Sequence, residues 1–501
     1  PLQAADKTRF QASWSDLAWK QWKLLPGAEH FSGTLSGSVE NGLLTASMKQ
    51  AKMPYETVFR APLEIADGQA TISWLNNDKG FQLDGRNIDV KAKAVHARGG
   101  FRYLQPANDE PWLGILAGIS TDDGSQAWRY FPENLMGKDL VDYLSGAIQG
   151  GEADNATLVY GGNPQLFPYK HNEGQFEVLV PLRNAKFAFQ PDWPALTNLD
   201  IELDFINDGL WMKTDGVNLG GVRASNLTAV IPDYSKEKLL IDADIKGPGK
   251  AVGPYFDETP LKDSLGATLQ ELQLDGDVNA RLHLDIPLNG ELVTAKGEVT
   301  LRNNSLFIKP LASTLKNLSG KFSFINGDLQ SEPLTASWFN QPLNVDFSTK
   351  EGAKAYQVAV NLNGNWQPAK TGVLPEAVNE ALSGSVAWDG KVGIDLPYHA
   401  GATYNIELNG DLKNVSSHLP SPLAKPAGEP LPINVKVNGN LNSFELTGQA
   451  GADNHFNSRW LLGQKLTLDR AIWAADSKTL PPLPEQSGVE LNMPPMNGAE
   501  W

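Results

Sequence analysis

The chain has 501 residues and a mass of 54.4 kDa, which exceeds what one hydrophobic core usually organises. A formal net charge of −16, from 58 acidic residues against 42 Lys and Arg, repels phosphate backbones, so no nucleic-acid partner is expected. The sequence contains no cysteine, which excludes disulfides, zinc–thiolate sites, iron–sulfur clusters and cysteine nucleophiles. Composition therefore predicts several domains or one extended, repetitive structure.

The two ends of the sequence are typical of a segment from a longer protein. No stretch approaches the roughly 20 apolar residues that cross a bilayer as a helix, and the chain starts at Pro1 without a basic-then-apolar signal segment. Residues 497–501 read like the opening of a helix that the sequence does not complete. We therefore expect any membrane anchor to lie elsewhere in the parent chain.

The first half of the chain reads as one amphipathic helix followed by strands. Residues Asp139–Gln149 place apolar side chains on one side before Gly150-Gly151, which predicts a helix that ends there. Further along, apolar and polar residues alternate with the period of half-buried strands, at Phe176/Val178/Val180/Leu182, Leu199/Ile201/Leu203/Phe205 and Leu239/Ile241/Ala243/Ile245. Gly and Pro interrupt this pattern near residues 251–260, so we place a boundary between two parts, 1–250 and 251–501.

The second half opens with another short helical pattern, Leu261/Leu265/Leu269/Leu272, and returns to alternation. The run from Leu272 to Leu288 carries Leu274, Val278, Leu282, Leu284 and Ile286 on one face. At about 3.3 Å per residue it is too long for one strand, which predicts a break near Gly276. After it come a helical turn at 375–384, a loop at 418–432 and four further alternating segments: Leu343/Val345/Phe347, Tyr356/Val358/Val360/Leu362, Tyr404/Ile406/Leu408 and Ile433/Val435/Val437.

Asn-Gly and Asp-Gly dipeptides recur throughout the chain. Such pairs favour the two-residue turns of β-hairpins, so they predict antiparallel meanders. The pairs are Asp67-Gly68, Asp84-Gly85, Asp208-Gly209, Asp215-Gly216, Asn289-Gly290, Asn326-Gly327, Asn363-Gly364, Asp389-Gly390, Asn409-Gly410 and Asn438-Gly439.

Motifs that carry chemistry are missing from this sequence. The seven histidines are scattered, and Asp275, Asp277 and Asn279 lack the glycine position and the bidentate glutamate of a calcium loop. No G-x-S-x-G, P-loop or dinucleotide fingerprint is complete. The fourteen tryptophans could form a sugar platform, but packing in a core or groove explains them better. We therefore expect no catalytic residue, no metal and no cofactor.

The strand pattern itself indicates what the protein does. An antiparallel sheet with one apolar face has to cover that face, and the helices expected here are too few for so many strands. A curved sheet whose apolar face stays partly open would hold acyl chains, with headgroups left in water. The sequence thus predicts a mainly β fold: a long, twisted antiparallel sheet, rod-like, curved into an open apolar groove, with a few short amphipathic helices.

Several short segments of the sequence resemble conserved segments of the AsmA-like family of bacterial bridge-like lipid transfer proteins. In the first half these are Tyr130-Phe131-Pro132, residues 141–146 with Gly150-Gly151, residues 166–169, residues 174–176 and residues 187–194. In the second half they are Leu274-Asp275-Gly276 with Asp285-Ile286-Pro287, and Leu374-Pro375 with residues 382–384 and 394–397. These motifs are structural, so they identify a fold better than a mechanism.

The resemblance implies a location and a task. It implies a parent chain anchored in the inner membrane of a Gram-negative envelope, a β-groove in the periplasm, and phospholipids moving between inner and outer membrane. It supplies no catalytic residues. The implied partners are phospholipid acyl chains and the two membranes or their proteins, reached through regions outside this sequence.

We therefore predict a non-enzymatic lipid conduit. Two rivals remain: a structural or adhesive β-array that closes its apolar face on itself, and a polysaccharide-active enzyme with convergent acids under an aromatic platform. The apolar strand positions predicted to line the groove are Phe176, Val178, Val180, Ile201, Leu203, Phe205, Leu274, Val278, Leu282, Leu284, Ile286, Leu343, Val345, Phe347, Val358, Val360, Leu362, Ile406, Leu408, Val435 and Val437.

Overall fold

The computed structural model describes residues 8–23, 25–309, 312–372, 374–463 and 465–495. Strands make up 62% of the structure and helices 11%, and 28 strands belong to one hydrogen-bonded sheet. The prediction of a mainly β fold with a few short helices is therefore confirmed. The helix expected to open at residues 497–501 lies outside the described residues.

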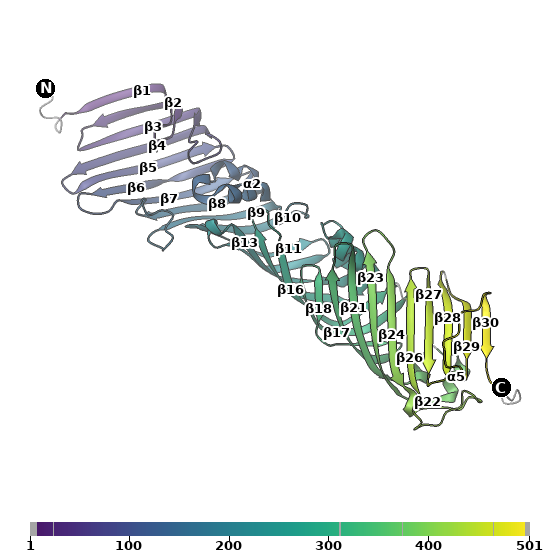
Figure 1. Cartoon of the computed structure of the whole chain (residues 1–501). Helices are drawn as coiled ribbons and strands as arrows, with labels where there is room; N and C mark the ends of the chain where they lie inside the picture. The colour runs from purple at the N-terminus through teal and green to yellow at the C-terminus, as the bar shows by residue number, and fades with distance from the viewer. Residues whose placement is uncertain (1–7, 24, 310–311, 373, 464, 496–501) are drawn as a thin grey trace. The chain divides into compact units, whose positions relative to one another are not determined.

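The first half of the chain is a series of strands with a helical insert between residues 121 and 148 (Figure 1). The insert comprises a 3₁₀-helix η2 (Gly124–Tyr130) and the helices α1 (Glu133–Met136) and α2 (Lys138–Ala147). The strands are β1 (Phe10–Trp19), β2 (Ala28–Gly37), β3 (Asn41–Met53), β4 (Leu63–Asn77), β5 (Gly80–Ala92), β6 (Val95–Pro106), β7 (Trp112–Thr121), β8 (Ile148–Gly162), β9 (Gln175–Phe187), β10 (Leu196–Ile206), β11 (Gly209–Leu219), β12 (Val222–Ile231) and β13 (Lys238–Pro248).

The second half repeats this plan with shorter helices. The short 3₁₀-helix η3 (Tyr234–Lys236) still belongs to the first half, between β12 and β13. The helical segments that follow are η4 (Gly249–Ala251), α3 (Val252–Phe256), η5 (Lys262–Gly266), α4 (Ala267–Glu271), η7 (Pro368–Lys370), α5 (Glu376–Ala381) and η8 (Leu412–Asn414). The strands are β14 (Leu272–Asp275), β15 (Asp277–Pro287), β16 (Thr294–Ile308), β17 (Ser313–Ile325), β18 (Asp328–Ser331), β19 (Leu334–Trp338), β20 (Gln341–Glu351), β21 (Ala355–Trp366), β22 (Leu382–Gly384), β23 (Val386–Pro397), β24 (Thr403–Asp411), β25 (Val415–Ser417), β26 (Pro432–Asn440), β27 (Ser443–Ala450), β28 (Asn454–Leu462), β29 (Leu466–Ala474) and β30 (Gly488–Asn492).

Most strands pair antiparallel with the next strand of the main sheet. Strands β1 to β11 follow one another as a meander, and β20, β21, β23, β24 and β26 do the same. β18 and β19 both pair with β17 and with β20, so together they replace one long strand. β30 pairs parallel with β29, and β22 and β25 form a separate two-stranded sheet.

The structure divides into two compact units. Of the described residues, unit 1 contains those from 8 to 219, 223–244 and 283–294, and unit 2 contains 220–222, 245–282 and those from 295 to 495. The functional division at residue 250 that the sequence suggests stays a prediction.

The predicted alternation along the strands is confirmed, because burial follows the same period. In β20, Leu343 and Val345 are buried while Asn344 is exposed, and in β21 Val358 and Leu362 are buried while Asn361 is exposed. The break expected in the run from Leu272 to Leu288 also exists. Gly276 separates β14 from β15 and has φ of +91°, a conformation that glycine adopts without strain.

The hairpin prediction was wrong for most Asn-Gly and Asp-Gly pairs. Asn289-Gly290 and Asn326-Gly327 do lie between strands, but Asn363-Gly364, Asp389-Gly390 and Asn409-Gly410 lie inside β21, β23 and β24. The physical reason is that a side chain from another residue packs against each of these glycines. Gly364 is directly opposite Trp388, and a Cβ at Gly364 would lie 3.1 Å from the Nε1 atom of that indole. A Cβ at Gly390 would lie 2.5 Å from Cδ2 of Leu408, and one at Gly410 would lie 3.2 Å from Cγ2 of Val386, so these glycines make room for cross-strand side chains instead of forming turns. Asp67-Gly68, Asp84-Gly85, Asp215-Gly216 and Asn438-Gly439 are likewise inside strands, and the turn at Asp208-Gly209 is made by Asn207 and Asp208 before β11 begins.

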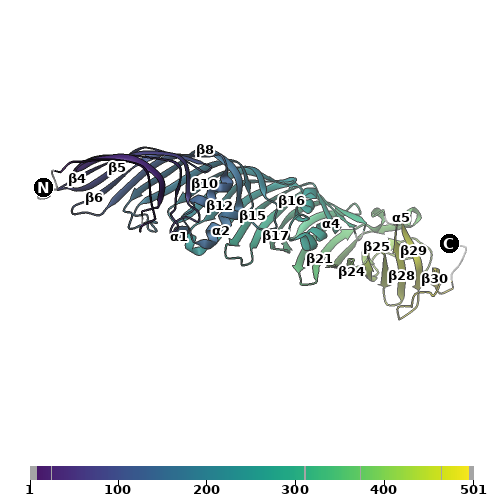
Figure 2. The ribbon, with the colours of Figure 1, turned by 90° about the horizontal axis from the view of Figure 1, so that it is seen from above.

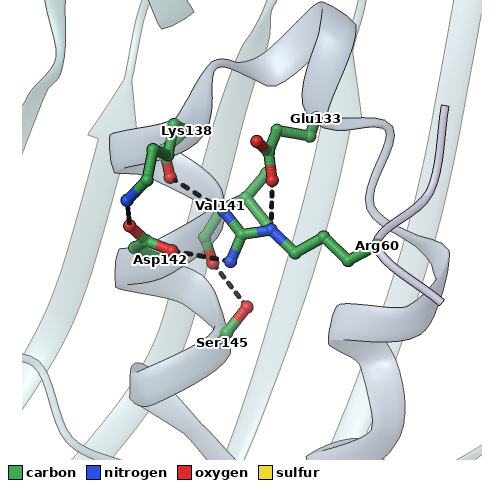
Figure 3. A network of polar contacts seen from close by, with 6 residues as sticks. All are labelled: Arg60, Glu133, Lys138, Val141, Asp142 and Ser145. Carbon is green, nitrogen blue, oxygen red and sulfur yellow. Dashed lines mark hydrogen bonds and ion pairs between the residues drawn. The ribbon is translucent and has the colours of Figure 1, made fainter. Parts of the chain in front are cut away.

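In unit 1 the guanidinium of Arg60 connects the helical insert to the segment between β3 and β4 (Figure 3). Arg60, which lies between β3 and β4, forms an ion pair with Glu133 of α1, and its Nη1 atom lies 2.6 Å from Oδ1 of Asp142 on α2. The other side of α2 is fully buried at Leu140, Val141 and Leu144. The predicted helix at 139–149 is thus present as α2, one residue earlier at its start and two residues shorter at its end.

Replacing Arg60 by leucine is expected to raise the amide hydrogen-exchange rates of α1 and α2, because Glu133 and Asp142 then lose their shared cation. We expect an increase of about threefold to tenfold, the range for partly exposed charged hydrogen bonds. Arg98→Leu, which removes a contact to Asp89 away from the insert, serves as the control. Unchanged exchange in both variants would contradict this account of the insert.

Acid should loosen the insert in the same way. The hydrogen bonds from Lys138 and Arg60 hold the pKa of Asp142 below its usual 3.8. A carboxylate with a lowered pKa stabilises the folded state above its unfolded value and loses that contribution as the pH falls through the folded value. The difference in exchange rate between the native chain and Arg60→Leu should therefore persist at neutral pH and shrink below about pH 4.

Candidate functional site

Unit 2 contains an apolar cavity on the face of the sheet formed by β14, β16 to β21 and β23, beside helix α4. Figure 2 labels α4 together with β16, β17 and β21. The empty space amounts to about 1130 Å³, part of it open to solvent. The lining residues are Leu269, Leu272, Leu274, Leu301, Leu306, Ile308, Leu315, Leu318, Phe322, Leu329, Leu334, Trp338, Val345, Phe347, Thr349, Val358, Val360, Leu362, Val392 and Ile394.

The register of the strands explains why one face is uniformly apolar. Val345 pairs with Leu362, and Val360 pairs with Val392, so apolar residues of one strand stand opposite apolar residues of the next. Directly opposite residues point to the same side of a sheet. The alternating pattern of each strand therefore adds up to a continuous apolar surface.

Thr349 is the polar residue among those that line the cavity, and its hydroxyl is already used within the protein. Its Oγ1 accepts a hydrogen bond from the Leu329 N–H at 2.8 Å and lies 2.8 Å from the Tyr356 hydroxyl. Tyr356 in turn donates to the Gly327 carbonyl at 2.6 Å, and burial raises the pKa of Tyr356 to about 12. The lining therefore offers a ligand neither a charge nor a free hydrogen-bonding group from these residues.

The structure brings part of the predicted groove together at this cavity. Leu274, Val345, Phe347, Val358, Val360 and Leu362 line it. Val278 and Leu343 belong to the adjoining buried core, and Ile406 and Val437 pack against that core. Leu408 and Val435 stand opposite each other on the neighbouring strands β24 and β26, two residues along from the pair Ile406 and Val437. Leu282 lies in the part of β15 that belongs to unit 2.

The remaining predicted residues belong to unit 1 and are not part of this cavity. Leu284 and Ile286 lie in β15, where Ile286 is buried and Leu284 is half-buried.

On β9 and β10, Val178 pairs with Phe205 and Val180 pairs with Leu203, which confirms that these residues share a face. That face carries protein contacts. Ile201 and Leu203 are buried, and Phe205 meets Phe131, just ahead of α1, with ring centroids 6.2 Å apart. The remaining predicted residue of β9, Phe176, lies among the aromatic rings of Tyr160 and Phe167.

Several lining residues escaped the sequence analysis because their strands are irregular. In β16 the apolar phase shifts between Leu301 and Leu306, where the backbone of Asn303 has φ of +55°. In β17 it shifts between Leu315 and Leu318, where Asn317 has φ of +54°. An extra residue in a strand turns the following side chains to the other face, so strict alternation misses them. An asparagine between two apolar segments of opposite phase is the signal that could have found them.

Two features are absent from the described part of the chain. Among the described residues, no group of three or more His, Asp or Glu side chains is placed to hold a metal ion. Within the same described residues, no helix combines the length and the hydrophobicity that crossing a membrane requires.

Comparison with known proteins gives two findings. A family model described as YhdP protein matches residues 1–501. Over 501 residues the chain is 99% identical to a protein of Escherichia coli (strain K12) named "Intermembrane phospholipid transporter YhdP", and the match covers 100% of this chain and 40% of that protein. The chain thus spans less than half the length of this curated relative. No solved structure matches the chain.

Proposed function

Since the chain belongs to the YhdP protein family, we propose that it is a non-enzymatic segment of a path that carries phospholipids between two membranes. The acyl chains lie on the apolar face of the sheet in unit 2, and the headgroups stay in water. The observation that carries this proposal is the cavity itself, whose lining is hydrocarbon and aromatic apart from one hydroxyl that the protein already satisfies.

Hydrophobic burial supplies enough free energy for such a cargo. Each CH₂ group that leaves water contributes about 0.8 kcal/mol, so a single acyl chain gains on the order of 10 kcal/mol before the costs of binding are subtracted. A lining whose one hydroxyl is already bonded within the protein gives similar affinity at neighbouring positions, because no residue holds the acyl chain at one point. Movement along the face then needs no chemical step.

The name of the relative supports the cargo and the location. A transporter between two membranes acts in the cell envelope, so we place this chain in the periplasm and expect the parent chain to be anchored in the inner membrane. The partners at each end are then the inner and outer membranes or proteins in them. The charge of −16 opposes unaided docking of this segment on anionic bilayers, which assigns membrane contact to other parts of the parent chain.

The purified chain is expected to carry phospholipid. Extraction with organic solvent and mass spectrometry should find phospholipid at about one molecule or more per chain, because an apolar surface of this size is costly to leave in water. A β-protein of similar size without an apolar cavity, purified from the same cells, gives the background. Phospholipid at that background level would contradict the proposal and favour a structural β-array.

A further inference from the structure

Three tryptophans mark one end of the strands that form the cavity. Trp338 is the last residue of β19, Trp366 is the last residue of β21, and Trp388 lies near the start of β23. Trp338 lines the cavity, and Trp366 and Trp388 pack against the same core. Ring centroids lie 6.2 Å apart between Trp338 and Trp366 and 4.6 Å apart between Trp366 and Trp388. These three side chains are called the tryptophan row below.

The indole N–H groups of the row differ in their partners. Trp338 donates to Oγ of Ser313 at 2.6 Å, and Trp366 donates to the Pro342 carbonyl at 2.7 Å. The Nε1 atom of Trp388 is buried and has no hydrogen-bond partner in the protein. A buried N–H without an acceptor is costly, so an acceptor from a ligand would be favourable there.

Gly364 provides the space that these rings need. A Cβ at this position would lie 3.0 Å from Nε1 of Trp366 and 3.1 Å from Nε1 of Trp388. Both indole nitrogens therefore lie over the backbone of β21, next to the point where the strand ends.

At the other end of the same strands, the two tyrosine hydroxyls are already satisfied within the protein. Tyr356 donates to the Gly327 carbonyl at 2.6 Å, and Tyr398 donates to the Gly352 carbonyl at 2.8 Å. Lys350 forms an ion pair with Asp328. Formal charge does not distinguish the two ends of the strands. At this end, two lysines (Lys350 and Lys354) balance two acids (Asp328 and Glu351). Near the tryptophan row, Lys309 pairs with Glu271 at 2.9 Å.

We propose that the tryptophan row positions the ester and phosphate region of the bound phospholipid, so that headgroups leave the cavity at this end of the strands. Indole is favourable where hydrocarbon meets water, because the ring packs on apolar groups while the N–H reaches an acceptor. An ester carbonyl or a phosphate oxygen is the acceptor that a phospholipid brings to Trp388. This inference rests on the proposed function and adds an orientation to it.

The natural absence of cysteine allows a direct test of orientation. Gln367→Cys and Ala353→Cys, both at exposed positions, place a fluorescent label beyond either end of β21, whose 12 residues span about 40 Å. Each labelled chain is loaded with a phospholipid that carries a nitroxide quencher either on its headgroup or at the end of an acyl chain. The headgroup nitroxide is expected to quench the label at position 367 about fivefold more than the label at position 353, the factor for one or two net hydrogen bonds.

Substitutions in the row should remove this preference. In Trp366→Leu/Trp388→Leu, the ratio of headgroup quenching is expected to fall to about 1, while quenching by the acyl nitroxide stays within about twofold because apolar packing remains. Trp388→Phe alone keeps the ring and removes the unpartnered N–H, and it should lower the ratio at least about twofold without affecting folding.

The outcomes separate this inference from the function on which it rests. Equal headgroup quenching at both positions, stronger quenching at 353, or a ratio that survives in all the tryptophan variants would overturn the role of the row while acyl quenching still showed bound lipid. If neither lipid quenched the label at either position, the result would contradict the proposed function. It would then also contradict the proposed orientation of the lipid.

Discussion

Replacing Val360 by aspartate is expected to lower the amount of bound phospholipid at least about tenfold, because a carboxylate in an apolar site costs several kcal/mol. Val360 lines the cavity in the middle of β21, opposite Val392 of β23. The lining residues offer the new carboxylate no cationic partner, since all are apolar apart from Thr349. Lipid binding is measured by extraction and mass spectrometry of the purified variant, and folding by circular dichroism.

Asn361→Ala is the matched control, one residue along and on the opposite face. Its amide donates to Oδ1 of Asp346 at 2.8 Å on the exposed side, so its loss should cost less than about 1 kcal/mol and leave lipid binding unchanged. Val360→Leu, which keeps the site apolar, should also bind lipid. If Asn361→Ala were as damaging as Val360→Asp, the assignment of the two faces would be wrong.

Replacing Asn304 by alanine is expected to destabilise unit 2 by about 2–3 kcal/mol, the cost of leaving several buried polar groups unpaired. The side chain of Asn304 is 1% exposed and donates to the carbonyls of Asp275 and Asp277, each at 3.0 Å. It also accepts from the Arg302 N–H at 2.7 Å. The side-chain amide of Asn304 thus bonds to the backbone on both sides of Gly276, between the end of β14 and the start of β15. Urea unfolding followed by tryptophan fluorescence measures the change.

Asn344→Ala gives the comparison for this second prediction. Asn344 donates to Oδ1 of Asn363 at 3.0 Å on the exposed face, and removing such a surface contact should change stability by about 0.5 kcal/mol or less. Equal urea midpoints for the two alanine variants would show that the break at Gly276 does not depend on the Asn304 side chain.

Alternation predicts the sheet from sequence because it reports a property of the whole strand. A side chain on every second residue faces the core, so Val358, Val360 and Leu362 reveal both the strand and its buried face without knowledge of its neighbours. What alternation leaves open is whether that face is covered. The apolar faces of β10 and β21 look alike in sequence, yet Leu203 and Ile201 are buried in unit 1 while Val360 lines a cavity in unit 2.

The Asn-Gly pairs show where local interpretation fails. In isolation each pair favours a turn, but Asn344, Asn363, Asp389, Asn409 and Asn434 occupy consecutive register positions across five strands. Asn434 donates to Oδ1 of Asn409 at 2.6 Å, so these side chains form polar contacts on one face. The glycines that follow Asn363, Asp389 and Asn409 face the other way, and all three lie next to Trp388. Only the pairing of distant strands creates this environment, and a single-sequence pattern does not contain it.

Capture of lipid by a light-activated residue in the full-length parent chain tests the central claim most directly. A photoreactive phenylalanine analogue in place of Phe347 would lie in the cavity, and the same residue in place of Asp346 would lie on the opposite face of β20. Irradiation of living cells, followed by mass spectrometry of the purified protein, should find phospholipid attached at position 347 and not at position 346. Equal attachment at both positions, or none at position 347, would contradict a phospholipid path along this face.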